Sequence, residues 1–173
     1  MKEKKLKILF RTSGGRARKQ QLGMGHIFRS VNLAFYLSPH KIFFLIEDFG
    51  GVKNVLLQKG FQNIEKLKAG IELKDDIIKT KNFVKNKKID ILIVDKFKVK
   101  SRFLQELRKI TKVVLIKDLN KFDYPADLLI NGFVGFENKV IKNRYGTLCL
   151  LGPSYQILNE KFSKKKSTKG KKN

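Results

Sequence analysis

Cysteine and histidine are scarce in this sequence of 173 residues, which contains one cysteine, Cys149, and two histidines, His26 and His40. A single cysteine excludes an intramolecular disulfide bond and fits the reducing cytoplasm. The spacing of these three residues does not resemble that of the ligands in a metal site. We therefore expect neither a bound metal nor another cofactor.

Long apolar runs are also missing. The N-terminus is rich in lysine, but the apolar residues behind it extend over about one strand before Arg11, unlike a signal peptide or a membrane helix. We expect a cytoplasmic protein. Hydrophobic residues make up 42% of the chain, and a chain of this length suits one packed domain, over residues 1–160, rather than two.

Acidic residues are few, with 15 against 39 lysines and arginines, which gives a net charge of +24. Such a surface attracts polyanions such as nucleic acid, anionic lipid headgroups and nucleotide phosphates. The lysines are spread over the whole chain, which favours a general compositional bias over a focused groove. Residues 161–173 hold seven lysines and no acid, so we expect a disordered tail there.

Strand-like and helix-like segments alternate along the chain. This alternation predicts an α/β fold with a doubly wound, mainly parallel, Rossmann-like sheet. In the common strand order of such sheets the first and fourth strands are neighbours, and ligands bind where the order reverses between them. The expected strands are 6–11, 41–47, 61–67, 89–94, 113–116, 128–130 and 147–151, and the expected helices are 27–37, 50–59, 73–87 and 101–110.

The turn after the first strand predicts a ligand site. Gly23 and Gly25 allow close approach to the backbone, and Gly25 comes just before a helix whose free N–H groups attract anions such as phosphate. His26 stands at or near the first helical position, where the positive end of the helix dipole favours a neutral imidazole that can act as a general base. On spacing alone, an ordinary glycine turn with a packed or capping histidine is equally compatible.

Three other polar residues, Asp95, Asp118 and Asn131, follow expected strands. Carboxyl ends of parallel strands share one edge of the sheet, so these side chains would line the same crevice as His26. Each of them taken alone is also compatible with an ordinary loop acid or turn former.

These residues resemble a known family. The matching segments resemble the N-terminal half of the UDP-sugar hydrolase of pseudaminic acid biosynthesis and are similar to related spore-coat polysaccharide proteins. Both groups are related to the two-domain GT-B glycosyltransferases that make lipid-linked peptidoglycan precursors. The resemblance runs over residues 5–162, with Gly-x-Gly-His-x-x-Arg at 23–29 as its most specific element. The segments that carry it are 8–11, 23–30, 89–95, 126–131 and 152–155, with Leu158 and Phe162.

The resemblance implies a single domain equivalent to the N-terminal half of a GT-B fold. It also implies hydrolysis of a UDP-linked 2,4-diacetamido-2,4,6-trideoxy sugar at its anomeric carbon, with release of UDP and with His26 as the base that activates water. Lys96 and Phe97 stand where the family tends to carry histidine and tyrosine. The residues expected to bind the substrate are Arg11, Gly23, Gly25, Arg29, Asp95, Asp118, Asn131 and Tyr155.

In such two-domain proteins the C-terminal half holds most of the nucleotide. The resemblance therefore implies either half of a split enzyme, completed by a separate nucleotide-binding subunit, or a truncated remnant. One alternative is the acceptor-binding half of a split glycosyltransferase, lying peripherally on the anionic inner face of the membrane. A basic nucleic-acid-binding domain is a second alternative. It is disfavoured because neither an aromatic stacking platform nor a recognition helix is evident.

Overall fold

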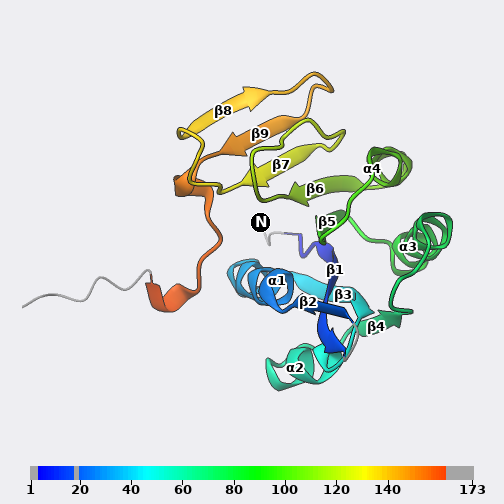
Figure 1. Ribbon diagram of the computed structural model, residues 1–173. Helices are drawn as coiled ribbons and strands as arrows, with labels where there is room; N and C mark the ends of the chain where they lie inside the picture. Colours follow the sequence, from blue (N-terminus) through cyan, green and yellow to red (C-terminus); the bar gives the residue numbers. More distant parts are fainter. Residues whose placement is uncertain (1–3, 18–19, 163–173) are drawn as a thin grey trace, which may run out of the picture.

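The computed structural model describes residues 4–17 and 20–162 (Figure 1). The helices are α1 (Gly25–Tyr36), α2 (Val52–Gln58), α3 (Leu73–Lys87) and α4 (Ser101–Arg108), followed by the short 3-10 helices η1 (Pro153–Tyr155) and η2 (Glu160–Phe162). The strands are β1 (Lys7–Ala17), β2 (Gln20–Gly23), β3 (Lys41–Asp48), β4 (Ile64–Leu67), β5 (Ile91–Asp95), β6 (Lys112–Ile116), β7 (Leu128–Asn131), β8 (Lys139–Lys142) and β9 (Leu148–Leu151).

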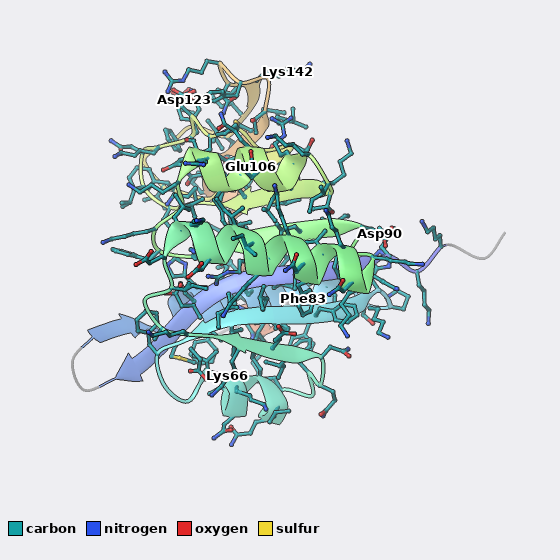
Figure 2. All side chains as sticks on the ribbon, turned by 90° about the vertical axis from the view of Figure 1, so that its right-hand side faces the viewer. Lys66, Phe83, Asp90, Glu106, Asp123 and Lys142 are labelled. Carbon is teal, nitrogen blue, oxygen red and sulfur yellow. The ribbon has the colours of Figure 1, made fainter. Side chains whose placement is uncertain are left out.

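In the described part of the chain, nine strands form one sheet in the order β4-β3-β1-β5-β6-β7-β9-β8, and β2 pairs with the end of β1. All neighbours are parallel except the β1–β2 and β8–β9 pairs. Helices α1 and α2 cover one face of the sheet, and α3 and α4 cover the other (Figures 1 and 2). The predicted doubly wound, Rossmann-like α/β fold is confirmed.

Side chains along each strand point alternately to the two faces of the sheet, so each face has its own hydrophobic core. Ile8 and Phe10 of β1 pack toward α1 and α2, whereas Leu9 packs toward α3 and α4. Phe10 also stacks on Phe44 of β3, with ring centroids 5.2 Å apart. Each such side chain is fully buried, which contributes about 1.5–3 kcal/mol to folding. A strand buried on both faces therefore reads as a continuous apolar run.

The strand order reverses between β1 and β5, as the alternation predicts. β1 lies between β3 and β5 and is parallel to both, and Thr12 of β1 is in register with Asp95 at the end of β5. The chain leaves β1 toward α1 on one face and enters β5 from α3 on the other. The carboxyl ends of β1 and β5 therefore form the edge at which open α/β sheets bind ligands.

The first strand is longer than predicted, because β1 runs past Arg11 to Ala17. β1 continues in register with β3 as far as Gly14 opposite Asp48, and from Gly15 it pairs with β2, with a register shift between Gly15 and Arg16. Figure 2 shows this hairpin extending beyond the edge of the sheet. Strand β8 and both 3-10 helices are absent from the prediction, and α4 begins at Ser101 as predicted but ends at Arg108.

The chain returns to α1 after β9 (Figure 1). The amide of Asn159 donates a hydrogen bond to the side chain of Asn32 in α1, at 3.1 Å. Lys161 and Phe162, the first residues of the predicted disordered tail, belong to η2, and residues 163–173 lie outside the described residues. The longest described helix, α3, has 15 residues, and none in that part of the chain has the length and apolar character that crossing a bilayer requires.

Candidate functional site

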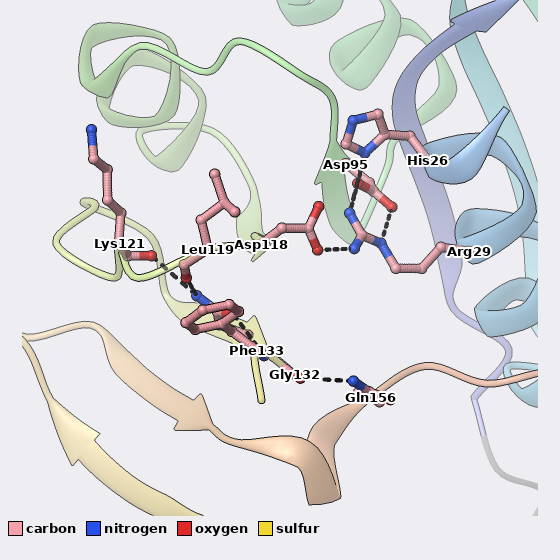
Figure 3. A network of polar contacts seen from close by, with 10 residues as sticks. His26, Arg29, Asp95, Asp118, Leu119, Lys121, Gly132, Phe133 and Gln156 are labelled. Carbon is pink, nitrogen blue, oxygen red and sulfur yellow. Dashed lines mark hydrogen bonds and ion pairs between the residues drawn. The ribbon is translucent and has the colours of Figure 1, made fainter. Parts of the chain in front are cut away.

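His26 and Asp95 meet at the edge where the strand order reverses (Figure 3). His26 is the second residue of α1, Asp95 is the last of β5, and the imidazole Nδ1 lies 2.7 Å from Oδ1 of the carboxylate. The Asp95 side chain is fully buried, whereas 17% of the His26 side chain is exposed. An ionised carboxylate only accepts hydrogen bonds, so we assign the proton to Nδ1, which leaves the Nε2 lone pair available.

Arg29 pairs with Asp95 through both carboxylate oxygens. Its Nε and Nη2 donate to the two carboxylate oxygens of Asp95 at 2.8 and 2.6 Å, and its Nη1 donates to Asp118. Burial lowers the pKa of Arg29, but the hydrogen bonds and charges of these two acids outweigh it and raise the pKa above its ordinary value. Nη2 also lies 3.1 Å from His26 Nδ1. With the proton on Nδ1, that contact joins two donors and is not a hydrogen bond.

Asp118 is the exposed acid of the site, with 54% of its side chain accessible. Burial tends to raise the pKa of Asp118, but the hydrogen bond and the charge of Arg29 hold it below its usual value. Asp118 is therefore an ionised, solvent-accessible acceptor at the mouth of the site.

Asn131 holds the loop that carries Asp118. Its amide donates to the backbone oxygens of Leu119 at 2.8 Å and Lys121 at 3.2 Å, and its own oxygen accepts from the N–H of Phe133 at 3.1 Å (Figure 3). The side chain is fully buried. Asn131 therefore lies at the predicted edge, but its hydrogen bonds hold the loop and its side chain is covered.

The N-terminus of α1 is open. Met24 at the cap position makes no side-chain hydrogen bond to the helix, and the first turn contains no acid. A Cβ added at Gly23 or Gly25 would meet no atom within 4 Å, although φ of +68° at Gly23 favours glycine. Uncapped N–H groups beside two bare glycines suit an approaching anion or sugar.

Two buried hydroxyls near this site escaped the sequence analysis. Thr12 Oγ1 and Ser30 Oγ have no hydrogen-bond partner among the described residues. Thr12 is in register with Asp95, and Ser30 follows Arg29 on α1. A threonine in a strand and a serine in a helix give no signal in one sequence, because their significance depends on the pairing of β1 with β5.

Arg11 and Tyr155 are not brought to His26. Arg11 lies on the α3 side of the sheet, is fully buried, and pairs with Asp76 and Glu47. Its burial corrects the expectation that it contacts the substrate beside His26. Tyr155 follows β9, three positions from β5 in the strand order, and within the described residues no hydrogen bond links its side chain to this site.

Within residues 4–17 and 20–162, no group of three or more histidine, cysteine, aspartate or glutamate side chains is arranged to hold a metal ion. His26, Arg29, Asp95 and Asp118 instead form one polar group, in which the Asp95 carboxylate contacts both the imidazole and the guanidinium. It can accept a proton at one defined atom, Nε2 of His26.

A comparison with models of known protein families finds no match. The chain is 30% identical over 158 residues to an uncharacterized protein of Methanocaldococcus jannaschii. The match covers 84% of this chain and 30% of that protein. The chain therefore spans less than a third of the length of this curated relative. The relative's name gives no activity, so the resemblance to the UDP-sugar hydrolases stays a prediction.

Proposed function

We propose that this chain is the base-bearing domain of a nucleotide-sugar hydrolase, which uses water to release UDP from a UDP-linked diacetamido sugar. The observation that carries the proposal is the 2.7 Å contact between His26 Nδ1 and buried Asp95, at the edge where β1 and β5 meet. It fixes the imidazole so that Nε2 is the only ring atom that can take a proton.

In the proposed reaction, Nε2 of His26 removes a proton from water while the water oxygen bonds to the anomeric carbon. The bond from that carbon to the diphosphate oxygen breaks, and UDP leaves with the electron pair. Asp95 stabilises the imidazolium that forms. General base catalysis of this kind typically contributes about 10²–10⁴-fold in rate. The open N–H groups of α1 are suited to the charge that develops on the diphosphate.

The proposal includes a separate C-terminal nucleotide-binding subunit. The described residues supply a base, an exposed acid and an open helix end, but Arg29 is committed to two carboxylates and Arg11 is buried on the other face. Neither arginine is therefore available to neutralise a diphosphate. Cationic groups from a partner domain would complete the site, in keeping with the two-domain resemblance.

The test measures UDP release from the UDP-linked sugar, with the chain alone and with the proposed subunit co-expressed. We expect His26→Ala to abolish release. His40→Ala is the matched control, because His40 lies just before β3, at the opposite edge of the sheet, and should leave release unchanged. Release that survives His26→Ala, or no release with either preparation, would contradict the proposal.

An acceptor-binding half of a glycosyltransferase is the second candidate. It is favoured by the net charge of +24 and by three exposed aromatic side chains on α1, Phe28, Phe35 and Tyr36. In that case His26 would deprotonate an acceptor hydroxyl instead of water. This candidate predicts that the protein sediments with anionic vesicles at low salt and transfers sugar to an acceptor only when the partner is present. UDP release without any acceptor favours the hydrolase.

A further inference from the structure

A pocket of about 500 Å³ lies on the face of the sheet opposite His26. Glu47 of β3, Asp76 of α3 and Lys96, just after β5, contribute charged groups to it, while Phe49, Ile71 and Phe103 supply apolar walls. We call it the Lys96 pocket. Its volume is within the range of small-molecule sites, about 300–1,000 Å³, and the proposed His26 chemistry makes no use of it.

Arg11 fixes the floor of the Lys96 pocket. Its Nε and Nη2 donate to the two oxygens of Asp76 at 2.8 and 2.9 Å, and Nη2 also reaches Glu47 at 3.3 Å. Glu47 accepts a further hydrogen bond from the N–H of Gly70 at 3.0 Å. Both carboxylates are therefore held in place before any ligand arrives.

Lys96 retains hydrogen-bonding capacity. Its Nζ donates to Asp76 at 2.5 Å, and Glu47 lies 3.9 Å away, beyond hydrogen-bond distance. An ammonium group has three hydrogens, so others remain for a ligand in the pocket. Burial, and then the charge of Arg11, lower the pKa of Lys96. A bound anion would offset both effects.

The four charged residues indicate the charge of the ligand. Arg11 and Lys96 balance Asp76 and Glu47, so the cluster is neutral, and Lys98 and Lys100 add positive charge to the lining. Both acids repel any anion, and this repulsion doubles for a dianion, so one ammonium between two carboxylates suits a single negative charge better than two. Apolar residues would fill such a space at least as stably as a buried ion cluster, so stability alone does not explain the cluster.

We propose that the Lys96 pocket binds a small monocarboxylate with an apolar body. Its carboxylate accepts hydrogen bonds from Lys96 Nζ, and its body packs against Phe49, Ile71 and Phe103. This site is separate from the His26 site, because consecutive residues Asp95 and Lys96 serve opposite faces of the sheet. The inference does not depend on the proposed hydrolase function.

The test titrates the full nitrogen-labelled chain with octanoate and follows its proton–nitrogen correlation spectrum. Octanol is the uncharged control, and octyl phosphate is the dianionic one. We expect octanoate to shift the amide signals of Gly70, Lys96 and Val99 while leaving those of Gly25 and Asp118 in place. Octanol and octyl phosphate should each bind at least about tenfold more weakly.

Three variants test the contacts. Lys96→Met should weaken octanoate binding at least about tenfold and leave octanol binding unchanged. Lys85→Met also removes one positive charge, but Lys85 lies on α3 outside the pocket, so this variant should bind octanoate as the parent does. Phe97→Ala removes an exposed apolar part of the lining without touching the ion cluster. It should weaken the binding of both octanoate and octanol, and it decides the test if Lys96→Met does not fold.

The proposal is overturned if octanoate shifts none of the three pocket amides or binds equally well to the Lys96→Met variant. It is also overturned if octyl phosphate binds as tightly as octanoate, because the site would then not select a monoanion. Loss of octanoate binding in Lys85→Met as well would show attraction by net charge alone, again against the proposal. None of these results depends on UDP release, so failure here is distinguishable from failure of the His26 site.

Discussion

At the level of single residues, the pairing of His26 with Asp95 determines which imidazole nitrogen can act as a base. Asp95 receives three hydrogen bonds, one from His26 and two from Arg29, and is fully buried. A neutral side chain at this position would leave Arg29 without its main partner and the imidazole without an anion to stabilise its charged form.

Asp95→Asn should therefore lower the rate of UDP release by about 10²–10⁴-fold, because the amide no longer stabilises the imidazolium. Asp118→Asn is the matched control, since Asp118 contacts Arg29 but makes no hydrogen bond with His26; its effect should be much smaller. Steady-state kinetics of the two variants make the comparison. Equal rates for Asp95→Asn and the parent would exclude Asp95 from the mechanism.

A substitution at Gly25 distinguishes a glycine that folding requires from one that ligand binding requires. Nothing lies within 4 Å of a Cβ at this position, and Gly25 belongs to α1. Gly25→Ala should leave the free energy of unfolding unchanged or raise it by up to about 1 kcal/mol, since alanine is the better helix former. The same change should weaken UDP-sugar binding at least about tenfold if the ligand occupies that space. Unchanged binding would place the ligand elsewhere.

Asp76 is the central acid of the buried cluster, with 1% of its side chain exposed. Asp76→Asn should lower the free energy of unfolding by about 3–5 kcal/mol, because Arg11 and Lys96 would remain buried without their main partner. Asp75→Asn, the exposed neighbour on α3, should cost far less. Urea unfolding curves of both variants test this, and similar losses in the two would contradict the account.

The same carboxyl group predicts a pH dependence. Burial tends to raise the pKa of Asp76, but the charge and hydrogen bonds of Arg11, followed by those of Lys96, lower it below its usual value. An acid with a lowered pKa in the folded state stabilises the protein above its unfolded pKa of about 3.9 and loses that contribution as the pH falls through the folded value. The extra stability of the parent over Asp76→Asn should therefore shrink only below about pH 4.

At the level of elements, the β1–β2 hairpin packs against the turn after β3. Gly15 has φ of +128°, and a Cβ there would lie 2.7 Å from the backbone of Phe49 and Gly50. Gly15→Ala should destabilise the fold by more than about 1 kcal/mol, since backbone atoms cannot yield and the φ value is unfavourable for alanine. Thermal unfolding measures the loss. Gly25→Ala is its control, and a Gly15→Ala variant as stable as Gly25→Ala would contradict the described packing.

Elements with a strong hydrophobic pattern are predicted well from the sequence. The apolar runs of β1, β3 and β5 and the spacing on α1 and α3 suffice, because burial on one or both faces dictates those patterns. The outer part of β1 and the strand β2 are missed. Their Thr-Ser-Gly-Gly stretch has no β pattern, and its extended form comes from pairing with β3 and with β2.

The candidate site is predicted in part, for a related reason. His26 and Asp95 are predicted because the N-terminus of α1 and the carboxyl end of β5 both lie where the strand order reverses. Arg11 is misplaced, because alternation in β1 sets it on the same face as Leu9, and the sequence does not tell which helices cover that face. Asn131 has the predicted location, but only its hydrogen bonds reveal that it supports a loop.

At the level of the whole molecule, the sheet separates two candidate sites. Asp95 serves the α1 face with His26, and the next residue, Lys96, serves the α3 face with Asp76. The high net charge adds attraction for anions over the entire surface. Geometry rather than charge therefore distinguishes the two sites, one by an oriented imidazole and the other by an ammonium in an apolar pocket.

The position of the ring proton on His26 tests the central claim most directly. Long-range proton–nitrogen correlation spectra of histidine-labelled protein show it, and with only two histidines in the chain the His26→Ala variant assigns the signals. We predict that the neutral ring carries its proton on Nδ1, with Nε2 unprotonated, and that Asp95→Asn weakens this preference. A neutral His26 protonated on Nε2 would contradict the account, because the exposed nitrogen could then accept no proton from water.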